Sequence, residues 1–142
     1  MKRWVCILAL CSPAAASGLD AARRLPPTFE ANRGQAKRQY KFVASRPEYA
    51  LLLESSGAVV RHARGAIHIA FVGARRGVDV EGVEPLSGKA NYIIGNRPAR
   101  WLRSIPIFSK VRYRGVYPGV DVLFHGSGGG LEFDFILAPG AH

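Results

Sequence analysis

The sequence is poor in cysteine. Only Cys6 and Cys11 carry thiols among its 142 residues, and both lie in an N-terminal segment that export is expected to remove. The exported chain would then have no disulfide, no thiol nucleophile and no thiolate ligand for a metal. About 125 residues remain, which is enough for a single domain to bury a hydrophobic core without disulfide bonds.

Long hydrophobic runs are also missing. The apolar run Trp4–Leu10 is far shorter than the roughly 20 residues that a membrane-spanning helix needs, and no later stretch reaches that length. The run follows the positively charged Met1–Arg3 and precedes the small residues Ala14–Ala16, which is the order of a secretory signal peptide. We therefore expect a secreted or cell-surface protein. A lipoprotein anchored at Cys11 is the alternative, but Leu10 stands where such signals have Gly or Ala.

Helical periodicity is the third absence. No window of about 11 residues shows a convincing 3.6-residue period, whereas turn signals recur about every eight to twelve residues. This pattern predicts an all-β fold, either an antiparallel β-sandwich or an open barrel of about eight to ten strands, with little helix. We divide the chain into a signal peptide (1–16), an extended lead-in (17–28) and a β-rich domain (29–142).

Several motifs of catalysis and metal binding are absent as well. The glycine-rich segment Gly126–Gly130 lacks the Gly-Lys-Ser/Thr ending of a phosphate loop, and no Gly-x-Ser-x-Gly elbow occurs. His62, His68 and His125 do not have the spacing of zinc ligands. We predict a protein that is not an enzyme and that has no catalytic residues, no cofactor and no metal.

Period-two alternation and turn residues place the expected elements. Four successive strands, at residues 39–44, 49–54, 58–63 and 66–72, predict a meander. Further strands are expected at 78–80, 91–96 and 105–113, turns at 29–35 and 84–88, and one helical turn at 97–101 with Trp101 directed inward.

The stretch Val111–Leu137 predicts three strands joined by a Tyr-Pro-Gly turn and a glycine-rich loop. In the last hairpin, the apolar sets share a face if Val122 lies opposite Phe133 and Phe124 opposite Leu131. A slip by one residue would bury carboxylates, so the hydrophobic pattern fixes which face is which. This register makes 126–129 the loop.

The opposite face of that hairpin gathers the acidic residues Asp121, Glu132 and Asp134 together with His125. Converging carboxylates could form an acid/base pair or a calcium site. The other interpretation is cross-strand ion pairing, in which the preceding basic strand supplies the partners, each pair contributing roughly 0.2–1 kcal/mol. We favour ion pairing, because three basic residues lie nearby on the preceding strand: Lys110, Arg112 and Arg114.

The chain is strongly basic. Its formal net charge is +10, and loss of Lys2 and Arg3 with the signal peptide leaves about +8. The basic residues are scattered through loops, and neither a concentrated stripe nor a nucleic-acid-binding module is visible, so we expect no nucleic-acid partner. Attraction to an anionic polysaccharide, cell wall or membrane surface is the simpler consequence.

Four residues are candidates for ligand binding. Asn32 and Gln35 lie in an exposed-looking turn that could bind a sugar or a peptide, although a turn that closes onto the first strand explains them equally well. Trp101 and Tyr117 could stack on sugar rings, although aromatic residues in β proteins are more often part of the core. We expect Tyr117-Pro118-Gly119 to form a type II turn.

Five ordered blocks carry a resemblance to a known family. They are Phe29-Glu30-x-Asn32-x-Gly34-Gln35, Asn91-Tyr92 with Gly95-Asn96, Trp101 with Ile105-Pro106, Val116-Tyr117-Pro118-Gly119-Val120-Asp121, and Leu131-Glu132-Phe133-Asp134-Phe135 with Pro139-Gly140-Ala141. In this order and spacing the chain resembles an uncharacterised domain found ahead of bacterial beta-propeller (SBBP) repeats in large exported proteins.

The resemblance implies a β-rich domain that leads into downstream propeller repeats, and it implies no activity. Relatives usually continue into another strand, so the end at His142 predicts a C-terminally truncated domain. We expect a non-enzymatic, exported structural or adhesive module of a surface protein. A carbohydrate- or cell-wall-binding domain is the alternative, based on the basic surface and the aromatic candidates.

Overall fold

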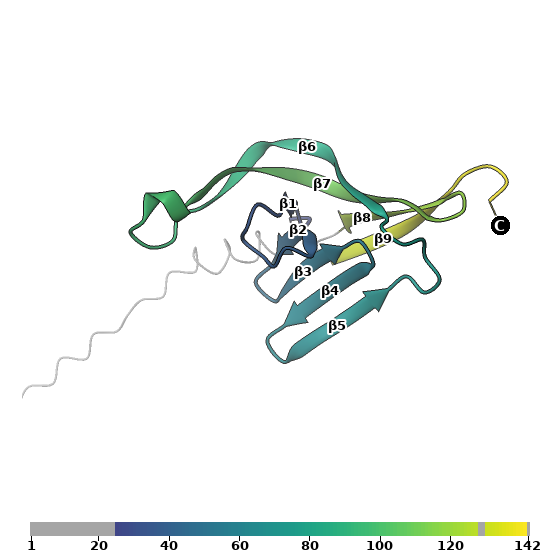
Figure 1. The fold of residues 1–142 in the computed structure, drawn as a ribbon, viewed down its shortest axis with the longest axis horizontal. Coiled ribbons are helices and arrows are strands. Elements are labelled where there is room, and N and C mark those ends of the chain that lie inside the picture. The colour runs from purple at the N-terminus through teal and green to yellow at the C-terminus, as the bar shows by residue number, and fades with distance from the viewer. Residues whose placement is uncertain (1–24, 128–129, 142) are drawn as a thin grey trace, which may run out of the picture.

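The computed structural model describes residues 25–127 and 130–141, which form an antiparallel all-β fold (Figure 1). The predicted signal peptide lies outside the described residues. Nine strands occur in the described part: β1 Phe29–Ala31, β2 Tyr40–Ser45, β3 Tyr49–Glu54, β4 Gly57–His62, β5 Gly65–Ala70, β6 Asp79–Tyr92, β7 Leu102–Tyr117, β8 Val120–Ser127 and β9 Gly130–Leu137. One 3-10 turn, η1, spans Pro98–Arg100. In these residues no helix is both long and apolar enough to cross a membrane.

Strand β7 connects the two parts of the sheet. Its residue Phe108 pairs with Phe29 of β1 and with Pro85 of β6. Further along, Val111 pairs with Phe124 of β8 and again with β6. Because a strand has only two edges, β6 occupies one edge of β7, and β1 and β8 follow each other along the other edge.

Two groups of strands, which we call wings, extend from β7. One runs from β1 through β2, β3 and β4 to β5, and the other runs from β8 to β9, which gives the order β5-β4-β3-β2-β1-β7-β8-β9. The sheet curls into a half-barrel, and Figure 1 shows β3, β4 and β5 on one side of the long β6–β7 pair. The predicted fold class, an antiparallel sandwich or open barrel, is confirmed.

The core lies between the wings. Its largest fully buried side chains come from β1, β3, β7 and β8: Phe29, Leu51, Leu53, Val111, Tyr113, Val116, Val122 and Phe124. The Tyr113 hydroxyl donates a 2.8 Å hydrogen bond to the Gly57 carbonyl at the start of β4, and the Phe71 ring packs edge-on against Tyr113. These contacts join β7 to the β1–β5 wing across the core.

The predicted meander is confirmed. Strands β2 to β5 follow one another as antiparallel neighbours, and their bounds lie within two residues of the predicted ones. The predicted helical turn is present as η1. Tyr117 pairs with Val120 across Pro118 and Gly119, and Gly119 has a φ of 72°, as the third residue of a type II turn requires.

The prediction for the middle of the chain is wrong. The expected strand at 78–80 and the expected turn at 84–88 belong to one 14-residue strand, β6, and the expected strand at 91–96 is absent beyond Tyr92, where β6 ends. Pairing with β7 continues on both sides of Pro85, and the register shifts between Pro85 and Lys89 while Glu84 adopts a φ of 56°. Proline is tolerated because β6 is an edge strand, where its missing N–H breaks no ladder.

A second correction concerns the first element of the domain. Residues 29–35 were expected to form a turn, but Phe29–Ala31 is strand β1 and only the residues after it turn. Phe29 is fully buried and pairs with Phe108, so burial of the aromatic ring extends the sheet into this segment.

The register of the last hairpin also differs from the prediction, by two residues. Phe124 lies opposite Phe133, Val122 opposite Phe135, and pairing continues to Ser127 and Gly130. A shift by two preserves the face of every side chain, so the hydrophobic pattern alone cannot distinguish the two registers. The observed register adds pairs at the loop end of both strands.

Candidate binding surface

The two polar candidates Asn32 and Gln35 hold their own loop together. The Asn32 side-chain nitrogen lies within 2.8–3.2 Å of the carbonyls of Ala36, Lys37 and Tyr40, and its side-chain oxygen accepts from the backbone N–H groups of Gly34 and Ala36. The Gln35 amide donates to the carbonyl of Ala31 and accepts from the N–H of Arg33. The polar groups of both candidates are therefore already engaged within the loop.

The two aromatic candidates lie at opposite ends of β7. The Trp101 indole donates to the carbonyl of Gly95, and the Tyr117 hydroxyl donates to the carbonyl of Val72, each at 3.0 Å. The sixteen residues of β7 lie between Trp101 and the turn that follows Tyr117, and at about 3.3 Å per residue they span roughly 50 Å. The two rings cannot contact one small ligand.

The predicted acidic cluster is divided. The Asp121 carboxylate accepts from the backbone N–H of Gly115 at 2.7 Å, whereas Asp134 lies 2.9 Å from the His125 ring. Glu132 lies opposite His125 in the strand register. In the described residues, no group of three His, Cys, Asp or Glu side chains could hold a metal ion. The geometry gives the acidic residues local partners and no common centre.

The basic residues of β7 have different partners from those predicted. Lys110 pairs with Glu84 and Arg114 with Glu81, each at 2.6 Å, so the pairs link β7 to β6 and not to the acidic hairpin. The hydrogen bond from Lys110, with a second from Ser109, lowers the pKa of Glu84. The hydrogen bond to Glu81 raises the pKa of Arg114. The predicted ion pairs between these basic residues and the acidic hairpin are therefore wrong. Their partners lie on β6, which was expected to be broken into separate elements.

The remaining candidate surface is an arm that leaves the body of the fold. From Lys89 to Tyr92, β6 pairs only with residues 102–106 of β7, and no other described strand pairs with this part. We call residues 89–106 the arm and residues 93–101 its tip. Figure 1 shows the arm extending to one side of the half-barrel, with the tip and η1 at its end.

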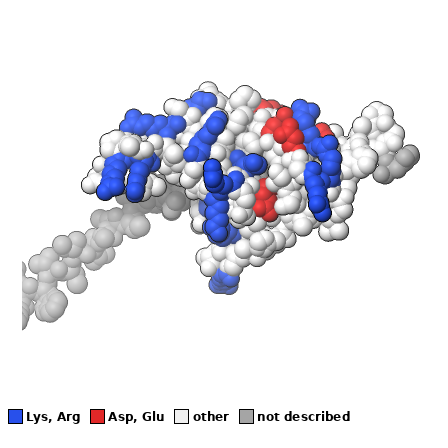
Figure 2. Space-filling view, viewed as in Figure 1, with Lys and Arg blue, Asp and Glu red and all other residues white. Residues whose placement is uncertain are grey.

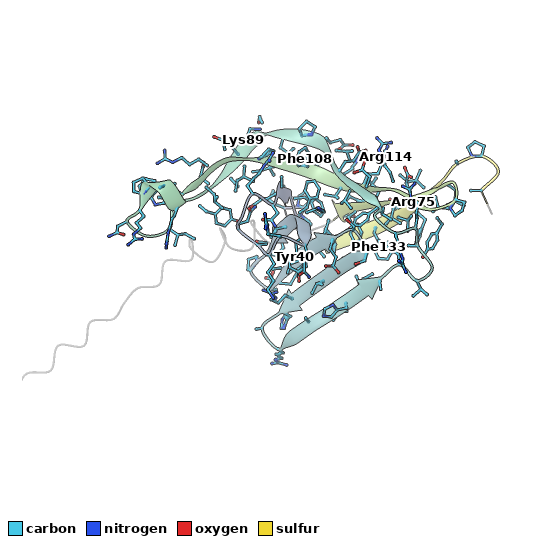
Figure 3. All side chains as sticks on the ribbon, viewed as in Figure 1. Tyr40, Arg75, Lys89, Phe108, Arg114 and Phe133 are labelled. Carbon is cyan, nitrogen blue, oxygen red and sulfur yellow. The ribbon has the colours of Figure 1, made fainter. Side chains whose placement is uncertain are left out.

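The arm carries positive charge and no negative charge. Between Glu84 and Asp121 the sequence has seven Lys or Arg residues and no Asp or Glu. Four of the seven lie in the arm, at Lys89, Arg97, Arg100 and Arg103. Figure 2 shows blue side chains at this end of the molecule, with the red ones closer to the body. Figure 3 labels Lys89 on the arm, and Arg114 outside the arm, at the other end of the β6–β7 pair.

The tip combines this charge with exposed apolar side chains. Ile93 is 52% exposed and Ile94 is 73% exposed. An open hollow of about 420 Å³ is lined by Ile94, Gly95, Asn96, Arg97 and Arg100. The Arg103 guanidinium lies 5.0 Å from the centre of the Trp101 ring, in a cation–π contact.

Backbone hydrogen bonds fix the shape of the tip. Besides the Trp101–Gly95 bond, the N–H of Ser104 donates to the Asn91 side chain at 2.9 Å, and η1 closes with a bond from the N–H of Trp101 to the carbonyl of Pro98. A two-stranded hairpin alone has marginal stability, so such bonds matter at the tip, where no residue from 93 to 101 is buried. The predicted inward direction of Trp101 fits this role, because its N–H points back into the loop.

A hydrogen bond from Tyr92 anchors the arm to the body. Its hydroxyl donates to Glu30 of β1 at 2.6 Å. Burial, reinforced by the bond to Glu30, raises the pKa of Tyr92 to about 12. The phenol therefore stays neutral and keeps donating throughout the neutral pH range.

Sequence reasoning missed the arm as a unit. The isoleucines were assigned to a short apolar strand, and the arginines were counted among scattered loop charges. The absence of acidic residues between Glu84 and Asp121 is a signal that could have identified the arm, since it gives one long hairpin a single sign of charge.

A family model described as "Domain of unknown function (DUF7948)" matches residues 29–142. The chain belongs to this family. The DUF7948 match covers the whole set of nine strands and begins with β1. No curated protein and no solved structure matches this DUF7948 chain. The family description assigns no activity, so the arguments about function rest on the surface described above.

Proposed function

We propose that the chain is a non-enzymatic, exported adhesive module that attaches to an anionic extracytoplasmic surface through its arm. One observation carries this proposal: a two-stranded arm that leaves the body bears four basic residues and no acidic residue. Clustered positive charge attracts polyanions and speeds their association, and salt screens this attraction. Anionic cell-wall polysaccharide and anionic lipid both belong to this class of surface.

The contacts of the candidate site residues support a non-enzymatic role. Asn32, Gln35, Trp101 and Tyr117 each use their polar groups to hold the backbone, and Asp121 does the same with Gly115. Catalysis by paired carboxylates requires two acidic groups that face the same reacting atoms. Asp121 and Asp134 instead have separate partners.

We place this module at the head of a larger surface protein with downstream propeller repeats. The support is the ordered set of sequence blocks described above, together with the signal-like N-terminus. In such an arrangement the half-barrel is a rigid base, the arm makes the contact, and the repeats follow the last strand.

The test uses the chain from Ser17 onward, which is the form predicted to be exported and which keeps every described residue. Binding to dextran sulfate resin and to phosphatidylglycerol vesicles is measured as salt is raised. The variant Arg97→Gln/Arg100→Gln removes two charges from the arm. The matched control, Arg75→Gln/Arg76→Gln, removes two charges from the loop between β5 and β6.

We expect salt-sensitive binding to at least one of the two surfaces. The tip variant should bind roughly 30-fold more weakly, since each basic residue at an anionic surface contributes about 1 kcal/mol. The control variant should lose several-fold less affinity than the tip variant. Binding to neither surface, or an equal loss in both variants, would contradict the proposal.

Binding of neutral sugars through Trp101 is a second candidate, because this indole lies partly exposed beside the hollow at the tip. Arg103 lies over the indole ring, so a sugar would have to stack on what remains accessible. This candidate predicts binding to neutral glycans that is insensitive to salt and lost in Trp101→Ala. A glycan array without signal would exclude it.

A further inference from the structure

The tip of the arm exposes apolar side chains that the fold cannot bury. Ile93 and Ile94 are adjacent in the chain and lie beyond the last ladder pair of the hairpin, Tyr92 with Leu102. They project from a hydrogen-bonded loop in which no residue from 93 to 101 is buried. Exposed apolar residues that cluster at a projecting point are a feature of interaction sites.

Basic groups surround these isoleucines. Arg97 and Arg100 line the hollow that Ile94 also lines, and Arg103 lies close by on the Trp101 ring. A guanidinium binds a phosphate through paired hydrogen bonds, and it retains its charge at any physiological pH. The hollow, about 420 Å³ and open to solvent, therefore has the lining that a phosphate-bearing headgroup requires.

We propose that the tip docks on an anionic lipid bilayer, with Ile93 and Ile94 entering the interface and Arg97 and Arg100 binding lipid phosphates. This inference rests on the proposed function and names the surface. Moving an apolar side chain from water into an apolar environment is favourable, and the acyl region of a bilayer offers an apolar environment directly below the phosphates. A hydrated polysaccharide offers the charge without the apolar layer.

The position of Trp101 fits the same geometry. Indole rings favour the boundary between headgroups and acyl chains, where one part of the ring is apolar and its N–H is bonded. Here the N–H is already satisfied by Gly95, so the ring can approach the interface without leaving a donor unpaired. The preformed loop also lowers the conformational entropy lost on docking.

The experiment measures partition of the chain from Ser17 onward into vesicles of phosphatidylglycerol and phosphatidylcholine, with pure phosphatidylcholine vesicles and dextran sulfate as comparisons. Trp101 is the only tryptophan in this chain, because the other, Trp4, precedes Ser17. Its fluorescence therefore reports the environment of the tip. The test variant is Ile93→Ser/Ile94→Ser, and the control is Ile67→Ser, which changes an isoleucine that is also exposed but lies on β5.

We expect binding to the anionic vesicles with a blue shift of the Trp101 emission, and roughly tenfold or greater loss of partition in the tip variant. The Ile67 control should bind like the unmodified chain. Circular dichroism that matches the unmodified chain should accompany both variants, because the changed side chains are exposed. For comparison, Arg97→Gln/Arg100→Gln should lose binding to anionic vesicles while retaining its fold.

Other outcomes separate this inference from the broader proposal. Binding to dextran sulfate without binding to vesicles would overturn the lipid assignment and leave adhesion to an anionic polymer standing. Vesicle binding that is unchanged in the isoleucine variant would also overturn it, since charge alone would then explain docking. Binding to neither vesicles nor dextran sulfate would contradict both the lipid assignment and the broader proposal of adhesion.

Discussion

Strands β8 and β9 have nearly the same alternating pattern but very different burial. Val122 and Phe124 of β8 are fully buried, whereas their cross-strand partners Phe135 and Phe133 are 51% and 41% exposed. All four side chains lie on the same face of the sheet. The difference arises because Val122 and Phe124 belong to the buried cluster shared with β2 and β3, to which Phe133 and Phe135 do not belong. Alternation thus determines which way a side chain faces, and a third element determines whether it is buried.

The largest effect is expected when each strand of this pair loses one aromatic ring. Phe124→Ala should lower the free energy of unfolding by about 3–5 kcal/mol, because it leaves a cavity in the core. Phe133→Ala, directly opposite, should lower it by only about 1–2 kcal/mol, because much of the ring is already in water. Urea denaturation of both variants measures the difference.

A more conservative substitution at the buried position keeps the comparison measurable if Phe124→Ala does not fold. Phe124→Leu retains most of the volume and should cost about 1–1.5 kcal/mol. If Phe133→Ala proved as costly as Phe124→Ala, the inner face of β9 would have to be covered in solution, and the comparison between the strands would fail.

A smaller effect is expected on the pH dependence of stability, in which the buried Tyr113 and the half-buried Tyr92 should differ. Burial raises the pKa of Tyr113 above its ordinary value near 10, and the pKa of Tyr92 is raised to about 12. The unfolded chain loses these protons first, so it binds fewer protons than the folded chain above pH 10. Stability from both groups is therefore complete below about pH 10 and decreases as pH rises.

Denaturation of Tyr113→Phe and Tyr92→Phe at increasing pH tests this linkage. Tyr113→Phe should cost about 1 kcal/mol at neutral pH for its bond to Gly57, and should flatten the alkaline loss of stability by up to about 1.4 kcal/mol per pH unit. Tyr92→Phe should flatten it less, and only up to about pH 12. Identical alkaline slopes in the unmodified chain and in Tyr113→Phe would contradict the assignment.

The sequence predicted the parts of this fold that depend on local alternation. The meander from β2 to β5 was found because polar turn residues separate its strands, and the Pro118-Gly119 turn because few other conformations suit that dipeptide. The register of β8 and β9 was wrong by two residues because that shift leaves both faces unchanged. Local pattern cannot separate alternatives that bury the same side chains.

Long-range pairing accounts for most of what the sequence did not predict. Pro85 and Gly88 signal a turn, yet β6 pairs with β7 at Pro85 and resumes at Lys89 after a register shift. Gly82 leaves room for the Phe108 ring, which lies 2.5 Å from where a Cβ would be. The candidate residues were identified by type, and five of them, Asn32, Gln35, Trp101, Tyr117 and Asp121, form hydrogen bonds with the backbone. The arm was not predicted because its two strands are adjacent in space but were assigned to different elements.

The smallest effect is expected on the outer face of β9, where the acidic residues lie. Asp134→Asn/Glu132→Gln removes the contact of Asp134 with His125, in which the Asp134 side chain is 63% exposed. Exposed ion pairs contribute about 0–1 kcal/mol, so the free energy of unfolding should change by less than about 1 kcal/mol, and by less still at high salt. Addition of calcium should leave the melting temperature of the unmodified chain unchanged, since ligand binding would raise it. A calcium-dependent increase that disappears in the double variant would instead make these carboxylates a binding site, and the outer face of β9 would then be its functional face.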